Sequence, residues 1–284
     1  MEILYKNSNV PRDVALILGF FDGIHAGHID VINNTPKISK VLVTFSNSPA
    51  EYFRKNIKYI YSREFNYNLL KELGIDYIYE QNFSEIAHLT ADEYLKKMVE
   101  IFSPKSITTG FNHTFGANRQ GNAEFLENNQ IGFEYYCTAP TLIDNEVVSS
   151  TRIKELLGYG ELQKANTFLT RDFSVESTVV AGEKIGRKIG YPTANLKYPE
   201  DIVKIPYGVY KVKCLGRPAV MNWGIKPTFD SSEIMEVHIP NFNEDLYGKN
   251  IRVEIFSKIR DEKKFNNIDE LKAQINEDIK ICLK

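Results

Sequence analysis

The stretch Gly19–His28, with the sequence GFFDGIHAGH, restricts the fold of this chain more than any other. It follows Val14–Leu18, a short apolar run that is typical of a buried strand. Glycine lets the backbone turn sharply and approach a ligand closely, so we expect a turn and then a helix from about Ile24. On that helix, His25 and His28 would share one face.

A helix N-terminus that carries two imidazoles is suited to phosphate binding. The alternative is an ordinary strand, turn and helix with two surface histidines, which any parallel α/β domain could contain. Our candidate ATP-phosphate and catalytic residues in this stretch are Gly19, Phe20, Asp22, Gly23, His25 and His28.

The first half of the chain alternates short apolar strands with helical stretches such as Ala91–Phe102. This alternation predicts an α/β domain with a parallel, Rossmann-like sheet and helices on both sides. Ligands then bind at the carboxyl ends of the strands, where Gly19–His28 would lie. The expected strands are Val14–Leu18, Val41–Phe45, Tyr77–Tyr79, Ser106–Thr109 and Gly132–Tyr136.

The pattern changes near Gly158–Gly160, after which strands follow one another without long helices. Alternation of apolar and polar residues there predicts an antiparallel barrel or sandwich. A terminal helix should begin after Asn267, with Ile268, Leu271, Ile275, Ile279 and Cys282 as its apolar stripe. The expected strands are Phe173–Val180, Gly208–Cys214, Pro218–Asn222, Glu233–Ile239 and Ile251–Phe256.

Composition excludes several classes of partner. The net charge of −2 argues against nucleic acid, because such ligands are held by basic surfaces. No apolar run approaches the roughly 20 residues of a membrane span, and the first residues lack the order of a signal peptide. Three scattered cysteines fit a reducing cytoplasm. We expect a cytoplasmic enzyme for small molecules, monomeric or weakly oligomeric, with neither nucleic acid nor membrane as partner.

A second candidate phosphate element is formed by Ser149, Ser150, Thr151 and Arg152. Ordinary N-capping needs only one hydroxyl, whereas three hydroxyls and a guanidinium together suit a triphosphate. Both interpretations stay open on this stretch alone.

A third element contains Gly182, Gly186, Arg187 and Gly190, and it leads into Pro192-Thr193-Ala194-Asn195. A flexible hairpin is the alternative, since the GK[ST] ending of a P-loop is missing. The oxygen atoms of Thr193 and Asn195 suit Mg²⁺ with bound phosphates. Further on, Glu236 and His238 should face the same way on one strand, which would otherwise be a solvated surface.

Residues 1–165 resemble the FMN adenylyltransferase module of prokaryotic bifunctional riboflavin kinase/FAD synthetases. The resemblance rests on GxFDGxHxGH, on the loop Gly110–Gly116 and on the SSTRI element. It implies that Asn112 and Phe115 contact the flavin. The chain departs from the family at Ser48, where the TFxPHP segment has histidine, at His113, where the loop has phenylalanine, and at Lys154, where the last element has arginine.

Residues 170–284 resemble riboflavin kinase through GxxxGRxxGxPTAN, NxGxxPTF, EVH and RxExxF. The resemblance implies a six-stranded barrel with Thr193 and Asn195 near Mg²⁺ and the ATP phosphates. It also implies Glu236 as the base for the ribityl hydroxyl, and Asn195, Arg260 and Phe265 near the flavin.

The sequence therefore predicts two transfers: riboflavin and ATP give FMN, and FMN and a second ATP give FAD and pyrophosphate, both with Mg²⁺. Three alternatives stay open. The chain could be a monofunctional relative with weakened adenylyl transfer, a flavin-binding sensor without turnover, or another HxGH nucleotidyltransferase.

Overall fold

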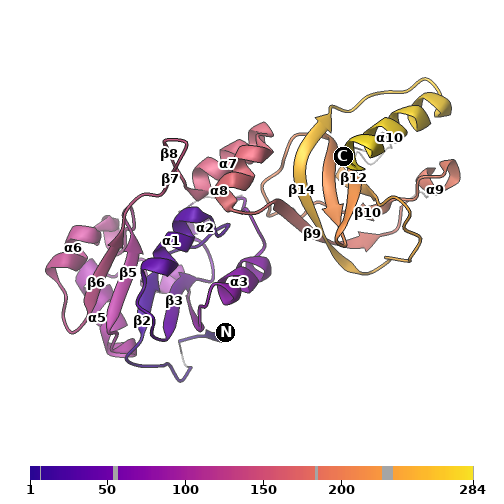
Figure 1. The fold of residues 1–284 in the computed structure, drawn as a ribbon. Helices are drawn as coiled ribbons and strands as arrows, with labels where there is room; N and C mark the ends of the chain where they lie inside the picture. The colour runs from indigo at the N-terminus through magenta and orange to yellow at the C-terminus, as the bar shows by residue number, and fades with distance from the viewer. Residues whose placement is uncertain (7, 54–56, 183–184, 226–232, 284) are drawn as a thin grey trace. The chain divides into compact units, whose positions relative to one another are not determined.

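The computed structural model describes residues 1–6, 8–53, 57–182, 185–225 and 233–283, and the chain forms two compact units (Figure 1). The first unit comprises Met1–Ile57 and Arg63–Ser150, and the second comprises Lys58–Ser62 and Thr151–Lys284. The chain therefore enters the second unit briefly, then returns to complete the first.

The first unit is built on a parallel sheet with the strand order β1-β4-β3-β2-β5-β6. Its strands are β1 (Glu2–Leu4), β2 (Ala15–Leu18), β3 (Lys40–Phe45), β4 (Tyr77–Gln81), β5 (Ser106–Gly110) and β6 (Glu134–Thr138). The five predicted strands are present, and β1 is an additional edge strand. The last one begins at Glu134 instead of Gly132, because Gly132 has a φ of 76°, which a strand does not adopt.

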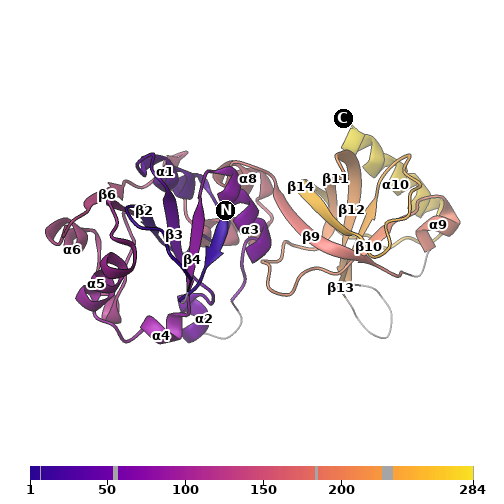
Figure 2. The ribbon, with the colours of Figure 1, turned by 90° about the horizontal axis from the view of Figure 1, so that it is seen from below.

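Helices cover both faces of this sheet, as parallel connections require, and Figure 2 shows α1 and α5 on opposite sides. The helical elements are α1 (Ala26–Asn34), α2 (Pro49–Phe53), α3 (Arg63–Glu72), α4 (Phe83–Ile86), α5 (Ala91–Phe102), η1 (Ala117–Arg119) and α6 (Ala123–Asn128). A small hairpin, β7 (Leu142–Ile143) and β8 (Glu146–Val147), follows β6. Helix α5 starts with a reciprocal cap between Thr90 and Glu93, and its Tyr94, Met98 and Phe102 are buried against the sheet.

The second unit is a closed barrel with the strand order β10-β13-β12-β11-β14-β9. Its strands are β9 (Phe173–Val180), β10 (Ala194–Leu196), β11 (Gly208–Cys214), β12 (Arg217–Ile225), β13 (Glu233–His238) and β14 (Asn250–Arg260), and all pairings are antiparallel. The predicted barrel is confirmed. The short strand β10 was missed because its three residues show no alternation to recognise.

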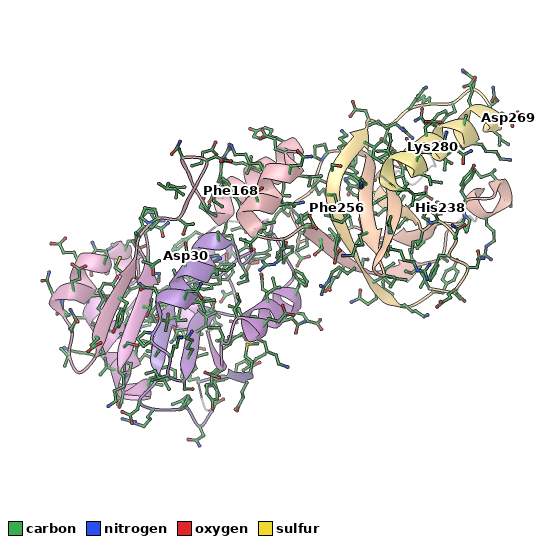
Figure 3. The ribbon with its side chains drawn as sticks, viewed as in Figure 1. Asp30, Phe168, His238, Phe256, Asp269 and Lys280 are labelled. Carbon is green, nitrogen blue, oxygen red and sulfur yellow. The ribbon has the colours of Figure 1, made fainter. Side chains whose placement is uncertain are left out.

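The helices described in this unit are α7 (Ser150–Tyr159), whose first residue still belongs to the first unit, α8 (Leu162–Leu169), α9 (Ile185–Ile189) and α10 (Ile268–Leu283). The α8 residue Phe168, labelled in Figure 3, is buried. Its neighbour Asn166 accepts a hydrogen bond from the backbone N–H of Phe173 and donates one to the carbonyl of Ile255. Helix α10 begins where predicted, since Asn267 accepts a hydrogen bond from the backbone of Glu270. Its stripe is shorter than predicted, because Ile268 is largely exposed.

The segment Lys58–Ser62 is a strap on the second unit. The backbone of Tyr59 donates to Asp201 and accepts from Val203, at 2.7 and 2.8 Å. Ile60 is fully buried, and the buried ring of Tyr61 stacks on Phe173.

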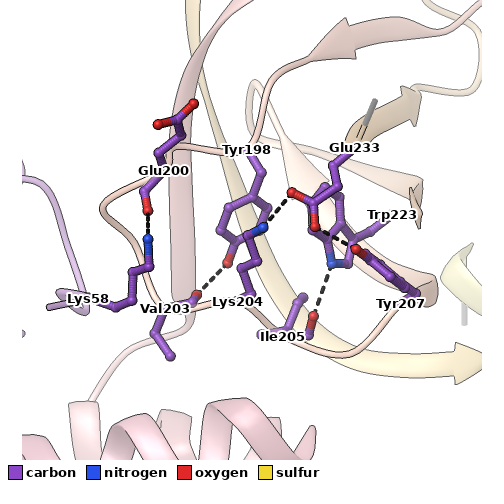
Figure 4. A network of polar contacts seen from close by, with 9 residues as sticks. All are labelled: Lys58, Tyr198, Glu200, Val203, Lys204, Ile205, Tyr207, Trp223 and Glu233. Atoms are coloured by element: carbon purple, nitrogen blue, oxygen red, sulfur yellow. Dashed lines mark hydrogen bonds and ion pairs between the residues drawn. The ribbon is translucent and has the colours of Figure 1, made fainter. Parts of the chain in front are cut away.

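Polar contacts around the buried Trp223 hold the segment 198–205 in place (Figure 4). This segment contains Asp201 and Val203, the backbone partners of the strap. Trp223 donates to the carbonyl of Ile205 at 3.0 Å, and Tyr198 donates to that of Val203 at 2.7 Å. Lys58 bonds the carbonyl of Glu200. The strap is thus held by both backbone and side-chain contacts.

Candidate active sites

The turn after β2 brings the two histidines of the first unit together. His25 is the N-cap of α1 and accepts a hydrogen bond from the backbone of His28, while His28 accepts one from the backbone of His25, both at 3.4 Å. Their rings stack with centroids 3.6 Å apart, and Phe21 stacks on His28 at 4.3 Å. Side chains held by their own backbone and by aromatic neighbours have little freedom to move.

Burial keeps both imidazoles neutral at pH 7. It lowers the pKa of His25 to about 4, and together with the neighbouring His25 it lowers the pKa of His28 well below its ordinary value. Each Nδ1 accepts a backbone N–H, so the single proton of each ring is on Nε2. The pair is therefore a preorganised set of two N–H donors.

Other predicted residues surround this turn. Gly23 has a φ of 84° and donates its N–H to Asn66 of α3, which the sequence did not indicate. Asp22 is buried, and Ser150 donates to its carbonyl oxygen at 2.8 Å. The structure thus joins Ser150, the second serine of the SSTRI element, to the histidine turn.

The remaining residues of these two elements differ in their exposure. Gly19 packs closely on Phe21, and Phe20 is half-buried. Ser149 is half-buried and Thr151 is exposed. Arg152 pairs with Glu155 at 3.3 Å within α7.

The predicted flavin loop after β5 has one exposed and one buried candidate. Asn112 is exposed, whereas Phe115 is buried with Tyr94 and Phe125 in the core. Burial lowers the pKa of His113 to about 4, and its ring stacks on Phe115 at 5.8 Å. The flavin contacts of this loop stay a prediction.

An aromatic cluster near the carboxyl end of β3 was not found from the sequence. Phe83 makes edge contacts with Phe45, Tyr52 and Phe53, at 5.4 to 6.0 Å between ring centroids. Phe53 is 72% exposed and Tyr52 is 50% exposed. Large exposed aromatic groups mark binding surfaces, and here they sit at the sheet edge where ligands bind in α/β folds.

Ser48, the departure in the same segment, caps α2. Its hydroxyl accepts from the backbone of Glu51, and the Glu51 carboxylate accepts from the backbone of Ser48, both at 3.1 Å. This capping box orients the helix that carries Tyr52 and Phe53.

In the second unit, the barrel register places three polar residues in one row. Glu236 of β13 is directly opposite Asn195 of β10 and Asn222 of β12. Residues opposite one another point to the same face of a sheet. Residues far apart in the sequence therefore meet at one place on the barrel wall, and Asn222 was not among the predicted site residues.

Two cavities adjoin this row, and Thr193 lines both. The first, of about 80 Å³, contains Gly182, Arg187, Asn195 and Tyr247 in its lining. The second, of about 300 Å³, contains Gly186, Glu236, Arg260 and Phe265. The smaller cavity gathers predicted phosphate residues with Asn195, which was predicted for both the metal and the flavin. The larger one gathers the predicted base and two predicted flavin residues, and it also contains Gly186, a predicted phosphate residue. Gly190 has a φ of 95° and lies in the connecting turn.

The small cavity has the chemistry of a cation and phosphate site. The Oδ1 atom of Asn195 is buried and has no hydrogen-bond partner among the described residues. A Cβ on Gly182 would lie 2.5 Å from this amide, and one on Gly186 would lie 2.3 Å from the carbonyl of Tyr191. Hard oxygen ligands in a cradle that only glycine permits fit Mg²⁺ with phosphate. Clusters of acidic, histidine or cysteine ligands are absent from the described residues.

Two features that the sequence did not reveal border the larger cavity. His238, labelled in Figure 3, lies on the barrel. It donates through Nδ1 to the carbonyl of Pro192 at 2.8 Å and so fixes the turn that carries Thr193. Helix α10 contributes Leu271, Ile275 and Asp278 to the lining. The Lys226–Phe229 part of the NxGxxPTF motif lies outside the described residues.

Among the described residues, we find no helix whose length and apolar character would let it cross a membrane.

Comparison with known proteins gives consistent matches for both halves. Residues 7–152 match the FAD synthetase family, and residues 169–284 match the riboflavin kinase family. The bifunctional riboflavin kinase/FMN adenylyltransferase of Buchnera aphidicola subsp. Schizaphis graminum is 34% identical over 99% of this chain and 96% of its own. The protein of that name from Escherichia coli K12 is 32% identical over 97% and 94%.

A crystal structure from Streptococcus pneumoniae, titled as a macrolide-efflux protein, has the same fold throughout. It is 30% identical, covers 99% of both chains and has a TM-score of 0.92.

Proposed function

Because the chain belongs to the bifunctional riboflavin kinase/FMN adenylyltransferase family, we propose that the two groups of candidate residues serve the two reactions separately. The enzyme phosphorylates riboflavin with ATP to give FMN, and it transfers AMP from a second ATP to FMN to give FAD. We assign the first reaction to residues 170–284 and the second to residues 1–165. The observation that carries the assignment is the row of Asn195, Glu236 and Asn222 between the two barrel cavities.

In the kinase site, the ribityl 5′-hydroxyl of riboflavin attacks the γ-phosphorus of ATP. The Glu236 carboxylate takes the hydroxyl proton, the new O–P bond forms, and the bond between the γ-phosphorus and its bridging oxygen breaks to release ADP. The flavin occupies the larger cavity, with Arg260 and Phe265 beside it. The ATP phosphates extend into the smaller cavity toward Arg187, so Thr193 lies where the substrates meet.

We assign Mg²⁺ to Thr193 and Asn195, on the evidence of the orphaned Asn195 oxygen and the glycine cradle. The ion, when bound there, supplies charge neutralisation for the ATP phosphates. The two side chains provide part of the shell, and the remaining ligands are phosphate oxygens and water.

In the adenylyltransferase site, a phosphate oxygen of FMN attacks the α-phosphorus of ATP, and pyrophosphate leaves. No protein group has to take a proton. The two Nε2–H groups of His25 and His28 donate to the phosphate oxygens as charge develops. The α1 N-terminus with Gly23, together with Ser149 and Ser150, holds the remaining phosphates. The exposed rings of Tyr52 and Phe53 give the isoalloxazine a surface on which to stack.

We place the enzyme in the cytoplasm, because all three cysteines are unpaired. A monomer or weak oligomer stays our expectation.

Resolving the flavins after incubation with riboflavin and ATP tests the proposal. FMN should appear first and FAD afterwards, and chelation of divalent metal should stop both. Binding of Mn²⁺·ATP, followed by electron paramagnetic resonance, should weaken in Asn195→Ala, with surface Asn128→Ala as the matched control. A product mixture without FAD would support the monofunctional alternative, and flavin binding without any product would support the sensor.

A further inference from the structure

Arg260, at the end of β14, is held by a buried carboxylate of the terminal helix. Its Nη2 donates to Oδ2 of Asp278 at 2.8 Å, and its Nε donates to Oδ1 and Oδ2 at 3.1 and 3.2 Å. The Asp278 side chain is only 2% exposed. Gln274, one turn earlier on α10, donates to Oδ1 at 3.0 Å. This two-point contact fixes the plane of the guanidinium.

Two further contacts complete the surroundings of the guanidinium. Nη1 donates to the carbonyl of Asp261 at 3.0 Å, and the ring of Phe265 lies 5.9 Å from the guanidinium carbon. Of the five N–H groups of arginine, three are thereby engaged. Within the described part of the chain, one N–H on each terminal nitrogen has no acceptor. Arg260 and Asp278 both line the larger cavity together with Glu236.

We infer that Asp278 is a positioning residue for riboflavin: it orients Arg260 so that the two remaining N–H groups donate to neighbouring acceptors on the heteroaromatic ring. The inference rests on the flavin site proposed above and deepens it. An isolated arginine would lose rotamer freedom when the substrate binds. The ion pair with the buried Asp278 removes that freedom beforehand, so less of the binding free energy is lost to ordering.

The inference gives α10 a role in substrate selection. A flat ring with adjacent carbonyl and imine acceptors can accept both N–H groups, whereas a ring without them covers two donors and leaves them unsatisfied. Leaving such donors unpaired weakens binding. The terminal helix therefore selects the isoalloxazine ring without touching the reacting hydroxyl.

Quenching of riboflavin fluorescence measures affinity without turnover, in the full chain. We expect Arg260→Met and Asp278→Asn each to raise the Kd about tenfold, as for loss of hydrogen bonds to a charged group. The double variant should bind no more weakly than Arg260→Met. The KM for riboflavin should rise with the Kd, while the KM for ATP and the conversion of FMN to FAD stay unchanged. Exposed Glu277→Gln, one residue earlier, is the matched control.

The outcomes distinguish failure of the proposed flavin site from failure of the positioning role of Asp278. Unchanged affinity in Arg260→Met overturns the flavin site itself. Weaker binding in Arg260→Met but not in Asp278→Asn overturns the positioning role. Asp278→Asn could also weaken riboflavin binding by the same factor in the Arg260→Met background as in the original protein. That result would show that Asp278 only stabilises the helix, and it would also overturn the positioning role. If Asp278→Asn fails to fold, Gln274→Ala keeps the charge and should still raise the Kd severalfold, and no change there overturns the inference.

Discussion

The two candidate sites of this enzyme are assembled in opposite ways. In the first unit, both histidines, their caps and the stacking Phe21 lie within one short stretch that follows a single strand. In the second unit, Asn195, Asn222, Glu236 and Asp278 come from three strands and the terminal helix. The first site therefore depends on local backbone geometry, and the second depends on register between distant segments. Substitutions should reveal this difference.

The largest effect is expected from Glu236→Gln. Loss of the proposed base should lower riboflavin phosphorylation by about 10²–10⁴-fold, whereas conversion of supplied FMN to FAD should be unchanged. Steady-state rates with each flavin substrate measure both. Glu176→Gln, another partly exposed strand glutamate of the barrel, is the control and should be neutral. Loss of both activities in a folded Glu236→Gln protein would contradict the separation of the sites.

His28→Ala comes next. Removing one preorganised donor costs about 10²–10³-fold in rate, and FAD formation should fall by this factor while FMN formation persists. Exposed His88→Ala is the control. Full adenylyl transfer in His28→Ala would refute the role of the histidine pair.

The pH dependence of stability should also differ between the units. Burial lowers the pKa of His25 from 6.5 to about 4, so below pH 6.5 the unfolded chain binds a proton that the folded chain does not. The first unit should lose up to about 3 kcal/mol between pH 6.5 and 4 from this group. Urea unfolding followed at several pH values measures the loss, and His25→Gln should reduce it. An identical pH dependence in His25→Gln would exclude this cause.

The smallest effect is expected from Ser48→Ala. Loss of an N-cap costs roughly 0.5–2 kcal/mol, so α2 should fray and FAD formation should fall severalfold through a higher KM for FMN. Ser48→Thr keeps a capping hydroxyl and should retain the activity of the original protein. An unchanged KM for FMN in Ser48→Ala would separate the cap from flavin binding.

The contrast between the sites also explains what the sequence could predict. The proximity of His25 and His28 could be predicted because local spacing alone defines their geometry. Asn222 was not named because its place in the row comes from pairing with Glu236 across the barrel. The sequence did contain an indication of Asp278. This residue lies three residues after Ile275 and four before Cys282, a spacing that puts its carboxylate on the apolar face of the helix. The cluster of Tyr52, Phe53 and Phe83 joins the helices α2 and α4. It was missed because both helices are too short to show an apolar periodicity in the sequence.

The strap Lys58–Ser62 limits the order in which the two units can finish folding during synthesis. These residues leave the ribosome well before Asp201 and Val203, the backbone partners that they require. N-terminal regions generally fold first during synthesis, yet Ile60 and Tyr61 must remain uncovered until the barrel exists. A chain cut between the two domains would leave these two apolar side chains permanently in water on one fragment, and would leave the barrel fragment without its cover. The two units are therefore not consecutive along the chain, because Lys58–Ser62 belongs to the second unit and interrupts the first.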